Sequence, residues 1–166
     1  MRASHPFSRV YAIYPCLGGF AFALIETRGR LVDWGKVDLG HRSEDAFSAR
    51  IEAELARFAP LTLALEAGGI PKRSVVAQRR IRRASEIADR LGIQSIAESG
   101  ESVRATLGLS ASATKHQVAA ELCRRFPELT HRIPKPSAWR RDPWMHVFVA
   151  IGLAWAATEA DSRPDA

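Results

Sequence analysis

A run of basic side chains in the middle of the sequence is the first feature with recognisable chemistry. No acidic residue occurs from position 67 to position 85, and six cations lie within twelve positions of that stretch: Lys72, Arg73, Arg79, Arg80, Arg82 and Arg83. Cations without counter-charges nearby attract phosphate groups, so this run favours a polyanionic partner such as nucleic acid. A basic helix face that merely lies in solvent is the alternative interpretation.

The elements around the basic run would position these cations. Residues 61–66 (LTLALE) form the pattern of a buried strand that ends in Glu66. Apolar residues then recur at helical spacing from Ala77 to Leu91, while Arg79, Arg82 and Arg83 fall outside that stripe. A helix here can therefore pack on a sheet and still present cations to a ligand.

The rest of the chain supplies further strands and helices. Strand patterns joined by tight turns occur at 9–14, 19–26 and 30–37, which predicts an antiparallel meander. The remainder of the chain is predicted as helices, one further strand and a loop. The helices span 43–58, 114–126 and 142 to about 159, a short helix and turn span 99–109, the strand spans 92–98 and the loop spans 127–143. Thr114 and Gln117 have the spacing of a capping box.

This order predicts an α/β fold with a mixed five-stranded sheet. A three-strand antiparallel meander and two parallel strands would make up the sheet, and helices would cover both faces. We expect a single domain over residues 9–160, with a flexible N-terminus over 1–8 and a flexible tail over 161–166.

The composition is that of a globular protein and excludes several other classes. Hydrophobic residues make up 46% of the 166 residues and charged residues 25%, and the net charge is +6. Two cysteines are too few for a disulfide framework. The longest apolar run, 147–157, is shorter than the roughly 20 residues that a membrane span needs. With no secretory signal pattern either, we expect a cytoplasmic protein without a membrane segment.

Five stretches of the chain, taken in order, resemble the RNase H-like superfamily and, within it, RuvC-type Holliday-junction resolvases. They are VYAIYPCLGGFAFALIE (10–26), LVDWG (31–35), LTLALE (61–66), TKHQVAAELCRRFP (114–127) and PWMHVFVAIGLAWA (143–156). The resemblance implies hydrolysis of phosphodiester bonds with two Mg²⁺ or Mn²⁺ ions. Carboxylates at the ends of the first and fourth strands and on the last helix would hold these metals.

In this sequence the resemblance assigns one remaining ligand and two lost ones. Glu66 stands where the fourth-strand acid is expected and is the candidate metal ligand, although a solvated carboxylate paired with an arginine is the alternative. Tyr14 and Val149 stand where acids are expected on the first strand and the last helix. A neutral phenol is a poor ligand for Mg²⁺, and valine is none. Asp142 is the nearest other acid, and capping of the last helix already explains it.

The resemblance therefore predicts a catalytically impaired or inactive nuclease that still binds nucleic acid, as branched or duplex DNA. No cofactor is expected if the chain is inactive, and Mg²⁺ or Mn²⁺ if it is active. Lys115 aligns with a basic residue that approaches the nucleic-acid backbone in relatives, although a lysine in solvent at the start of a helix is the alternative. A second copy of the chain or a companion subunit is the expected protein partner.

Two other functions stay open at this point. The first is an active Mg²⁺-dependent endonuclease with a rearranged metal site that uses Glu66, Asp142 or Asp33. The second is a protein-interaction scaffold that keeps only the fold and uses neither DNA nor metal.

Overall fold

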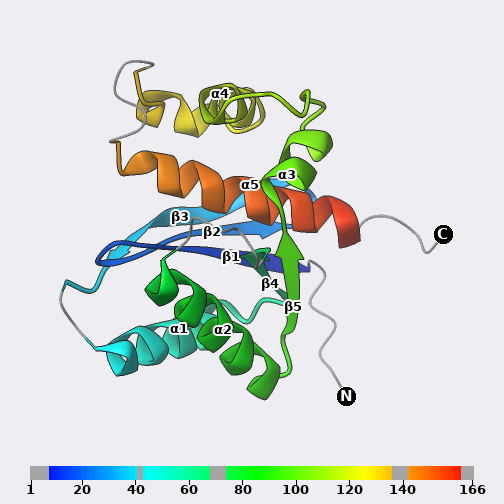
Figure 1. Ribbon diagram of the computed structural model, residues 1–166. Helices are drawn as coiled ribbons and strands as arrows, with labels where there is room; N and C mark the ends of the chain where they lie inside the picture. Colours follow the sequence, from blue (N-terminus) through cyan, green and yellow to red (C-terminus); the bar gives the residue numbers. More distant parts are fainter. Residues whose placement is uncertain (1–7, 41–42, 68–73, 136–141, 162–166) are drawn as a thin grey trace.

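The computed structural model describes residues 8–40, 43–67, 74–135 and 142–161, in which a five-stranded sheet forms the middle layer (Figure 1). The strand order is β3-β2-β1-β4-β5. β1 (Arg9–Cys16), β2 (Gly19–Glu26) and β3 (Arg30–Asp38) form an antiparallel meander. β4 (Thr62–Glu66) runs parallel to β1, and β5 (Gln94–Glu98) runs parallel to β4. The predicted mixed sheet is confirmed.

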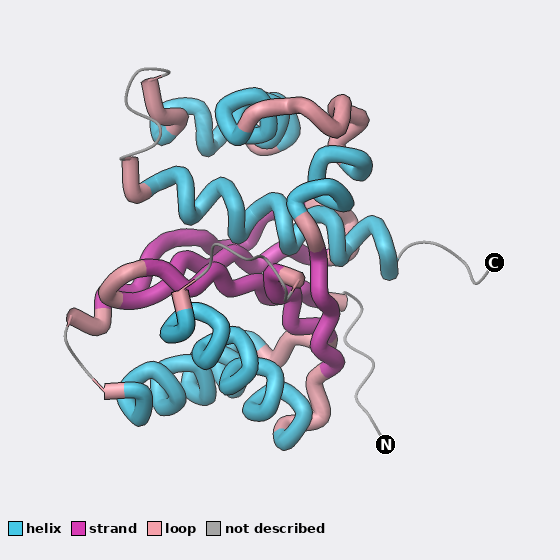
Figure 2. Tube along the Cα trace, viewed as in Figure 1, coloured by secondary structure: helices cyan, strands magenta, loops and turns pink. Residues whose placement is uncertain are grey.

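Helices cover both faces of this sheet, as Figure 2 shows. α1 (Glu44–Phe58) and α2 (Val75–Arg90) pack on one face, where Tyr11, Ile13 and Leu63 belong to their core. The other face carries α3 (Gly100–Thr106), α4 (Lys115–Arg125) and α5 (Trp144–Asp161). Because neighbouring residues of a strand point to opposite faces, β1, β2, β3 and β4 each contribute to two separate cores.

α5 is apolar around most of its circumference because it is buried between two layers. It lies on β1 and β2, and α3 and α4 cover its outer side (Figure 1). A Cβ atom built on Gly152 would lie 2.9 Å from Cγ1 of Val103, so the glycine lets α5 and α3 approach closely. The packing explains why nearly every turn of this helix carries hydrophobic residues.

The segment predicted as a loop over 127–143 begins instead with a 3₁₀ helix, Pro127–Arg132. Proline suits the first position of a helical turn because its φ angle is fixed and it needs no hydrogen-bond acceptor there. Leu129 is buried and anchors this turn in the core that surrounds α5, on the side of α4. The several prolines that indicated a loop therefore hid a short helix.

The structure bears on the predicted chain ends and on membrane segments only within the described residues. The predicted flexible ends, 1–8 and 161–166, lie outside the described residues except for positions 8 and 161. Among the helices within those ranges, none has both the length and the apolar character to cross a membrane.

Candidate functional site

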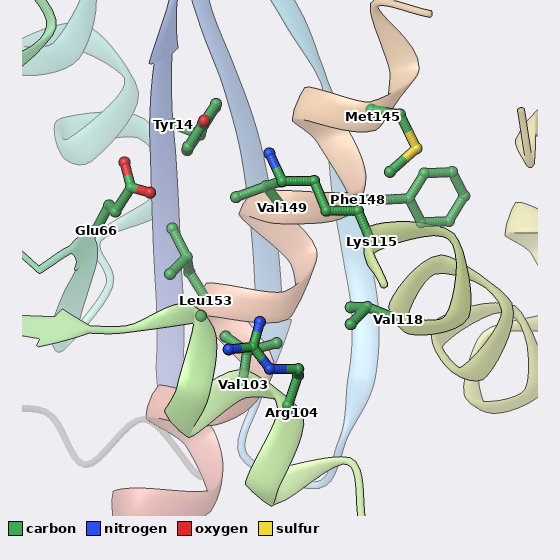
Figure 3. A pocket seen from close by; sticks show the side chains of 11 residues that line it. Tyr14, Glu66, Val103, Arg104, Lys115, Val118, Met145, Phe148, Val149 and Leu153 are labelled. Carbon is green, nitrogen blue, oxygen red and sulfur yellow. The ribbon is translucent and has the colours of Figure 1, made fainter. Parts of the chain in front are cut away.

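The register of the two central strands brings Tyr14 and Glu66 to one face of the sheet. β1 and β4 run parallel with Ala12 opposite Ala64, and both alanines belong to the core beneath α5. Two residues further along each strand, Tyr14 and Glu66 point to this same face, at the carboxyl ends of the strands (Figure 3). The sheet therefore places both side chains at one edge, beside α5.

A cavity opens at this edge between the sheet and the three helices that cover it. Its volume is about 580 Å³ including its open mouth. The residues that line it are Tyr14, Glu66, Gly100, Val103, Arg104, Lys115, Val118, Met145, Phe148, Val149 and Leu153. Four predicted site positions, Tyr14, Glu66, Lys115 and Val149, are thus brought together, although they come from four different elements.

Tyr14 closes one side of the cavity and is held in place by α5. Its side chain is buried, and its ring centroid lies 5.6 Å from that of His146. His146 lies one turn before Val149 on α5, so the same helix face reaches both the tyrosine and the cavity wall. The contact fixes the end of β1 against the first turns of the last helix.

Lys115 reaches the cavity from the first turn of α4. The predicted capping box is confirmed: Oγ1 of Thr114 accepts from the backbone N–H of Gln117 at 3.2 Å, and Oε1 of Gln117 accepts from the backbone N–H of Thr114 at 2.7 Å. This cap determines where the helix begins and hence where Lys115 lies. Val118, one turn further on, also lines the cavity.

Arg104 of α3 also lines the cavity, and the sequence analysis missed it. α3 begins directly after β5 and is fixed to that strand, because Oγ of Ser102 donates to Oε2 of Glu98 at 2.5 Å. β5 is parallel to β4, so α3 starts at the same sheet edge where Glu66 lies. A basic residue one turn into a helix that follows this strand is the signal that could have identified Arg104.

The donor set of the cavity does not fit a two-metal centre. Among the described residues that line it, Glu66 is the sole carboxylate, and it shares the cavity with the cations Arg104 and Lys115. No group of three or more His, Cys, Asp or Glu side chains within the described ranges is placed to hold a metal ion. Hard divalent cations need several oxygen ligands, which the lining residues do not supply.

The other two candidate acids lie outside the cavity lining. Oδ1 of Asp142 accepts from the backbone N–H of Trp144 at 2.8 Å, which caps the first turn of α5. Oδ1 of Asp33 accepts from the backbone N–H of Trp34 at 2.9 Å on β3. Neither acid lines the cavity that holds Glu66.

The described cations of the basic run differ in their surroundings in the structure. Lys72 and Arg73 lie outside the described residues. Arg80 was predicted to bind nucleic acid, but its side chain is buried and is used within the protein. Its Nε lies 3.3 Å from Oε1 of Glu44, its Nη1 donates to the carbonyl of Gly19 at 3.3 Å, and its guanidinium lies over the ring of Phe47. Arg80 therefore ties α2 to α1 and β2, and little of its side chain is open to a ligand.

The other arginines of α2 lie at the surface, on the face of the sheet opposite the cavity (Figure 1). Arg83 donates to Oγ of Ser48 at 3.0 Å and lies 3.3 Å from a carboxylate oxygen of Glu86. Arg79 and Arg82 are exposed. The cations of α2 and the cations of the cavity therefore form two separate surfaces.

Two solved structures of a bacterial RuvC have a fold similar to that of this chain. The structure of Thermus thermophilus RuvC matches with a TM-score of 0.68 and 19% sequence identity, over 92% of this chain and 95% of that one. T. thermophilus RuvC in complex with a Holliday junction substrate matches with a TM-score of 0.66 and 20% identity, over 93% of this chain and 95% of that one.

A viral protein shares the same architecture. The fowlpox virus Holliday junction resolvase matches with a TM-score of 0.59 and 13% identity, over 92% of this chain and 99% of the viral one. No protein-family model and no curated protein sequence matches the chain. The structural similarities show that the chain has an RNase H-like fold of the RuvC type, as its sequence predicted.

Proposed function

We propose that this chain binds branched or duplex nucleic acid at the cavity between β1, β4 and α5, and that it is impaired in metal-dependent cleavage. One observation carries the proposal. Among the described residues that line the cavity of Tyr14 and Val149, Glu66 is the only carboxylate, and it lies beside Arg104 and Lys115. Its charged side chains thus favour an anion over a divalent cation.

The charges of the cavity suit the backbone of a nucleic acid. Lys115 is exposed at the start of α4, and Arg104 is half-buried on α3, so both can meet a phosphate that approaches the open mouth. Contacts of this kind give affinity without reading the base sequence. A T. thermophilus RuvC of the same fold has been solved with a Holliday junction substrate, which supports branched DNA as the ligand class.

The exposed arginines of α2 form a second proposed contact surface, separate from the cavity. Arg79 and Arg82 lie on the helix that follows β4, and Arg83 is exposed beside them with partners on the protein. A branched substrate has several arms, so one arm can pass the cavity while another approaches the α2 face. Lys72 and Arg73, from the same run, stay predictions because they lie outside the described residues.

The proposal is tested with the full chain, a four-way DNA junction and a linear duplex of the same sequence. We expect the junction to bind with an affinity that falls steeply as salt is added, since each phosphate contact releases counterions. We expect little nicking of the junction with Mg²⁺ or Mn²⁺. Absence of salt-dependent binding to either DNA would favour the interaction scaffold instead.

An active endonuclease with a rearranged metal site is the alternative that would contradict the proposed loss of cleavage. It would appear as Mg²⁺-dependent nicking by the unsubstituted chain that is lost in Glu66→Ala. The positions of Asp142 and Asp33 outside the cavity lining give this alternative no support. A second copy or a companion subunit, and a cytoplasmic location, stay predictions.

A further inference from the structure

The walls of the cavity are mostly apolar, which binding of phosphate alone does not explain. α5 contributes Met145, Phe148, Val149 and Leu153, and Val103 and Val118 face them from α3 and α4 (Figure 3). Tyr14 adds a second aromatic ring to the lining, on the side of the sheet. A phosphate group gains nothing from such a lining, because burying a charge in an apolar space is unfavourable.

We propose that the cavity holds one unpaired nucleobase of the bound nucleic acid, while the adjacent phosphates lie on Lys115 and Arg104. This inference rests on the proposed function and names the part of the nucleic acid that the cavity takes. The cavity is open at its mouth, and its lining has the composition of pockets that bind small organic molecules. Such pockets combine apolar walls with a few polar groups that fix the orientation of the ligand.

Each part of a nucleotide has a matching group in the cavity. The faces of a base are apolar and polarisable, and they suit the aliphatic and aromatic walls. The edge of a base carries amino or imino donors, and the half-buried carboxylate of Glu66 is an acceptor for such donors. Oxygen atoms of the phosphate can accept hydrogen bonds from the cations Lys115 and Arg104.

Replacement of two acids explains how such a pocket could arise on this fold. At positions 14 and 149 the resemblance expects carboxylates, and the chain has an aromatic ring and an aliphatic side chain instead. Both replacements lower the negative charge of the cavity and make its walls more apolar. The changes that remove metal ligands therefore favour a neutral, flat group in the same space.

A hollow next to the cavity offers a path for the strand that carries the base. It measures about 740 Å³ including open space and is lined by the β1–β2 turn, the end of β3 and the start of α5. His146 lines this hollow and contacts Tyr14, so the hollow and the cavity lie on either side of one ring pair. Lys36 and Asp38 both line this hollow, and the Lys36 ammonium lies 5.5 Å from the ring centroid of Trp144, so the hollow is a path for the strand and not a further phosphate site.

The test is a double-mutant cycle between a base and a wall residue. Two four-way DNA junctions are compared, one with a single unpaired deoxycytidine at the branch point and one with an abasic residue in the same place. We expect the intact chain to bind the first roughly tenfold more tightly, the size of effect that one stacked base gives. Val149→Phe fills the cavity, so we expect it to bind both junctions equally.

Matched variants separate this effect from loss of folding. Val149→Ala keeps the cavity open, and we expect it to retain the preference for the junction that carries the base. Val118→Phe fills the cavity from the opposite wall and should lose the preference as Val149→Phe does. Circular dichroism and urea denaturation show which variants are folded.

The outcomes distinguish this inference from the proposed function. Equal affinity of the intact chain for the two junctions, or an unchanged preference in folded Val149→Phe and Val118→Phe, overturns the base site while DNA binding stands. Failure to bind any junction overturns both. Saturable binding of free deoxycytidine monophosphate, measured calorimetrically together with equal junction affinities, would assign the cavity to a free nucleotide and overturn the inference.

Discussion

The ring of Tyr14 on β1 lies 5.6 Å, centroid to centroid, from the ring of His146 on α5. This contact fixes the end of the first strand against the last helix, and Val149 follows one turn later on that helix. Positions 14 and 149 therefore line the same cavity as Glu66, although they are far apart in the sequence. The two positions that lack the expected acids can be tested together because the fold brings them together.

Restoring the two acids should create a metal site. Tyr14→Asp combined with Val149→Asp adds two carboxylates to that of Glu66, the one carboxylate among the described lining residues. Affinity for hard divalent cations depends on the number of charged oxygen ligands. We expect Mn²⁺ affinity, measured calorimetrically, to rise at least about tenfold. We also expect Mg²⁺-dependent nicking of a four-way junction to appear.

The matched control for this variant is Tyr14→Asn combined with Val149→Asn, which has nearly the same shape and no added charge. We expect the asparagine pair to bind Mn²⁺ as weakly as the unsubstituted chain. If the aspartate pair is folded but binds Mn²⁺ no better than the asparagine pair, these positions do not belong to a former metal site.

The cavity cations should contribute to DNA affinity in a way that salt reveals. Lys115→Gln and Arg104→Gln each remove one phosphate contact, so each should weaken binding to all sequences alike and lower the salt slope by about 1. Binding titrations at several salt concentrations measure both quantities. Arg57→Gln is the control, because Arg57 is exposed and lies far from the cavity. The carbonyl of its neighbour Phe58 accepts from Arg9, at the end of β1 opposite to Tyr14. An equal loss in Arg57→Gln would indicate general charge attraction instead of a site.

The fold could be predicted from the sequence because its signals are local. Strands with period two, helices with period 3.6 and the cap at Thr114 each depend on residues close in the chain. The convergence of Tyr14, Glu66 and Val149 was predictable as well, because the resemblance supplied the strand order that local patterns lack. Knowledge of the strand order was therefore enough to predict which sheet residues lie together in the site.

Two arginines show where prediction from the sequence ends. The pattern of α2 placed Arg80 among the ligand-binding cations, since its partners, Glu44 and the carbonyl of Gly19, lie far away in the sequence. Arg104 was not predicted, because its position depends on where the short helix α3 packs. The periodicity of a few residues does not determine that packing. Both errors concern contacts between elements, which no local pattern encodes.

Arg80 should matter for stability and not for binding of nucleic acid. Arg80→Ala leaves the carbonyl of Gly19 without this donor and removes the cation over the ring of Phe47, while the half-exposed Glu44 can turn to water. We expect a loss of about 2 kcal/mol in the free energy of unfolding, measured with urea. The exposed neighbour Arg79→Ala should change stability by less than about 0.5 kcal/mol. A folded Arg80→Ala variant with strongly weakened junction binding would contradict this assignment.

Tyr11 should make the fold less stable at alkaline pH. Its hydroxyl is buried, and no hydrogen-bond partner for it occurs among the described residues. Burial raises the pKa of this phenol well above its ordinary value, and the negative charge of Glu54 raises the pKa further. The folded chain therefore keeps Tyr11 protonated at a pH where the unfolded chain has lost the proton.

The sign of the pH dependence follows from this difference. Above a pH of about 10, the ordinary pKa of tyrosine, the unfolded state binds fewer protons than the folded state, so stability falls by about 1.4 kcal/mol per pH unit. Tyr11→Phe removes that loss and, because it also removes an unsatisfied buried hydroxyl, should gain about 1 kcal/mol near neutral pH. Urea denaturation of both proteins from pH 8 to pH 11 measures the two effects. Stability curves that stay parallel above pH 10 would show that Tyr11 ionises equally in the folded and unfolded states.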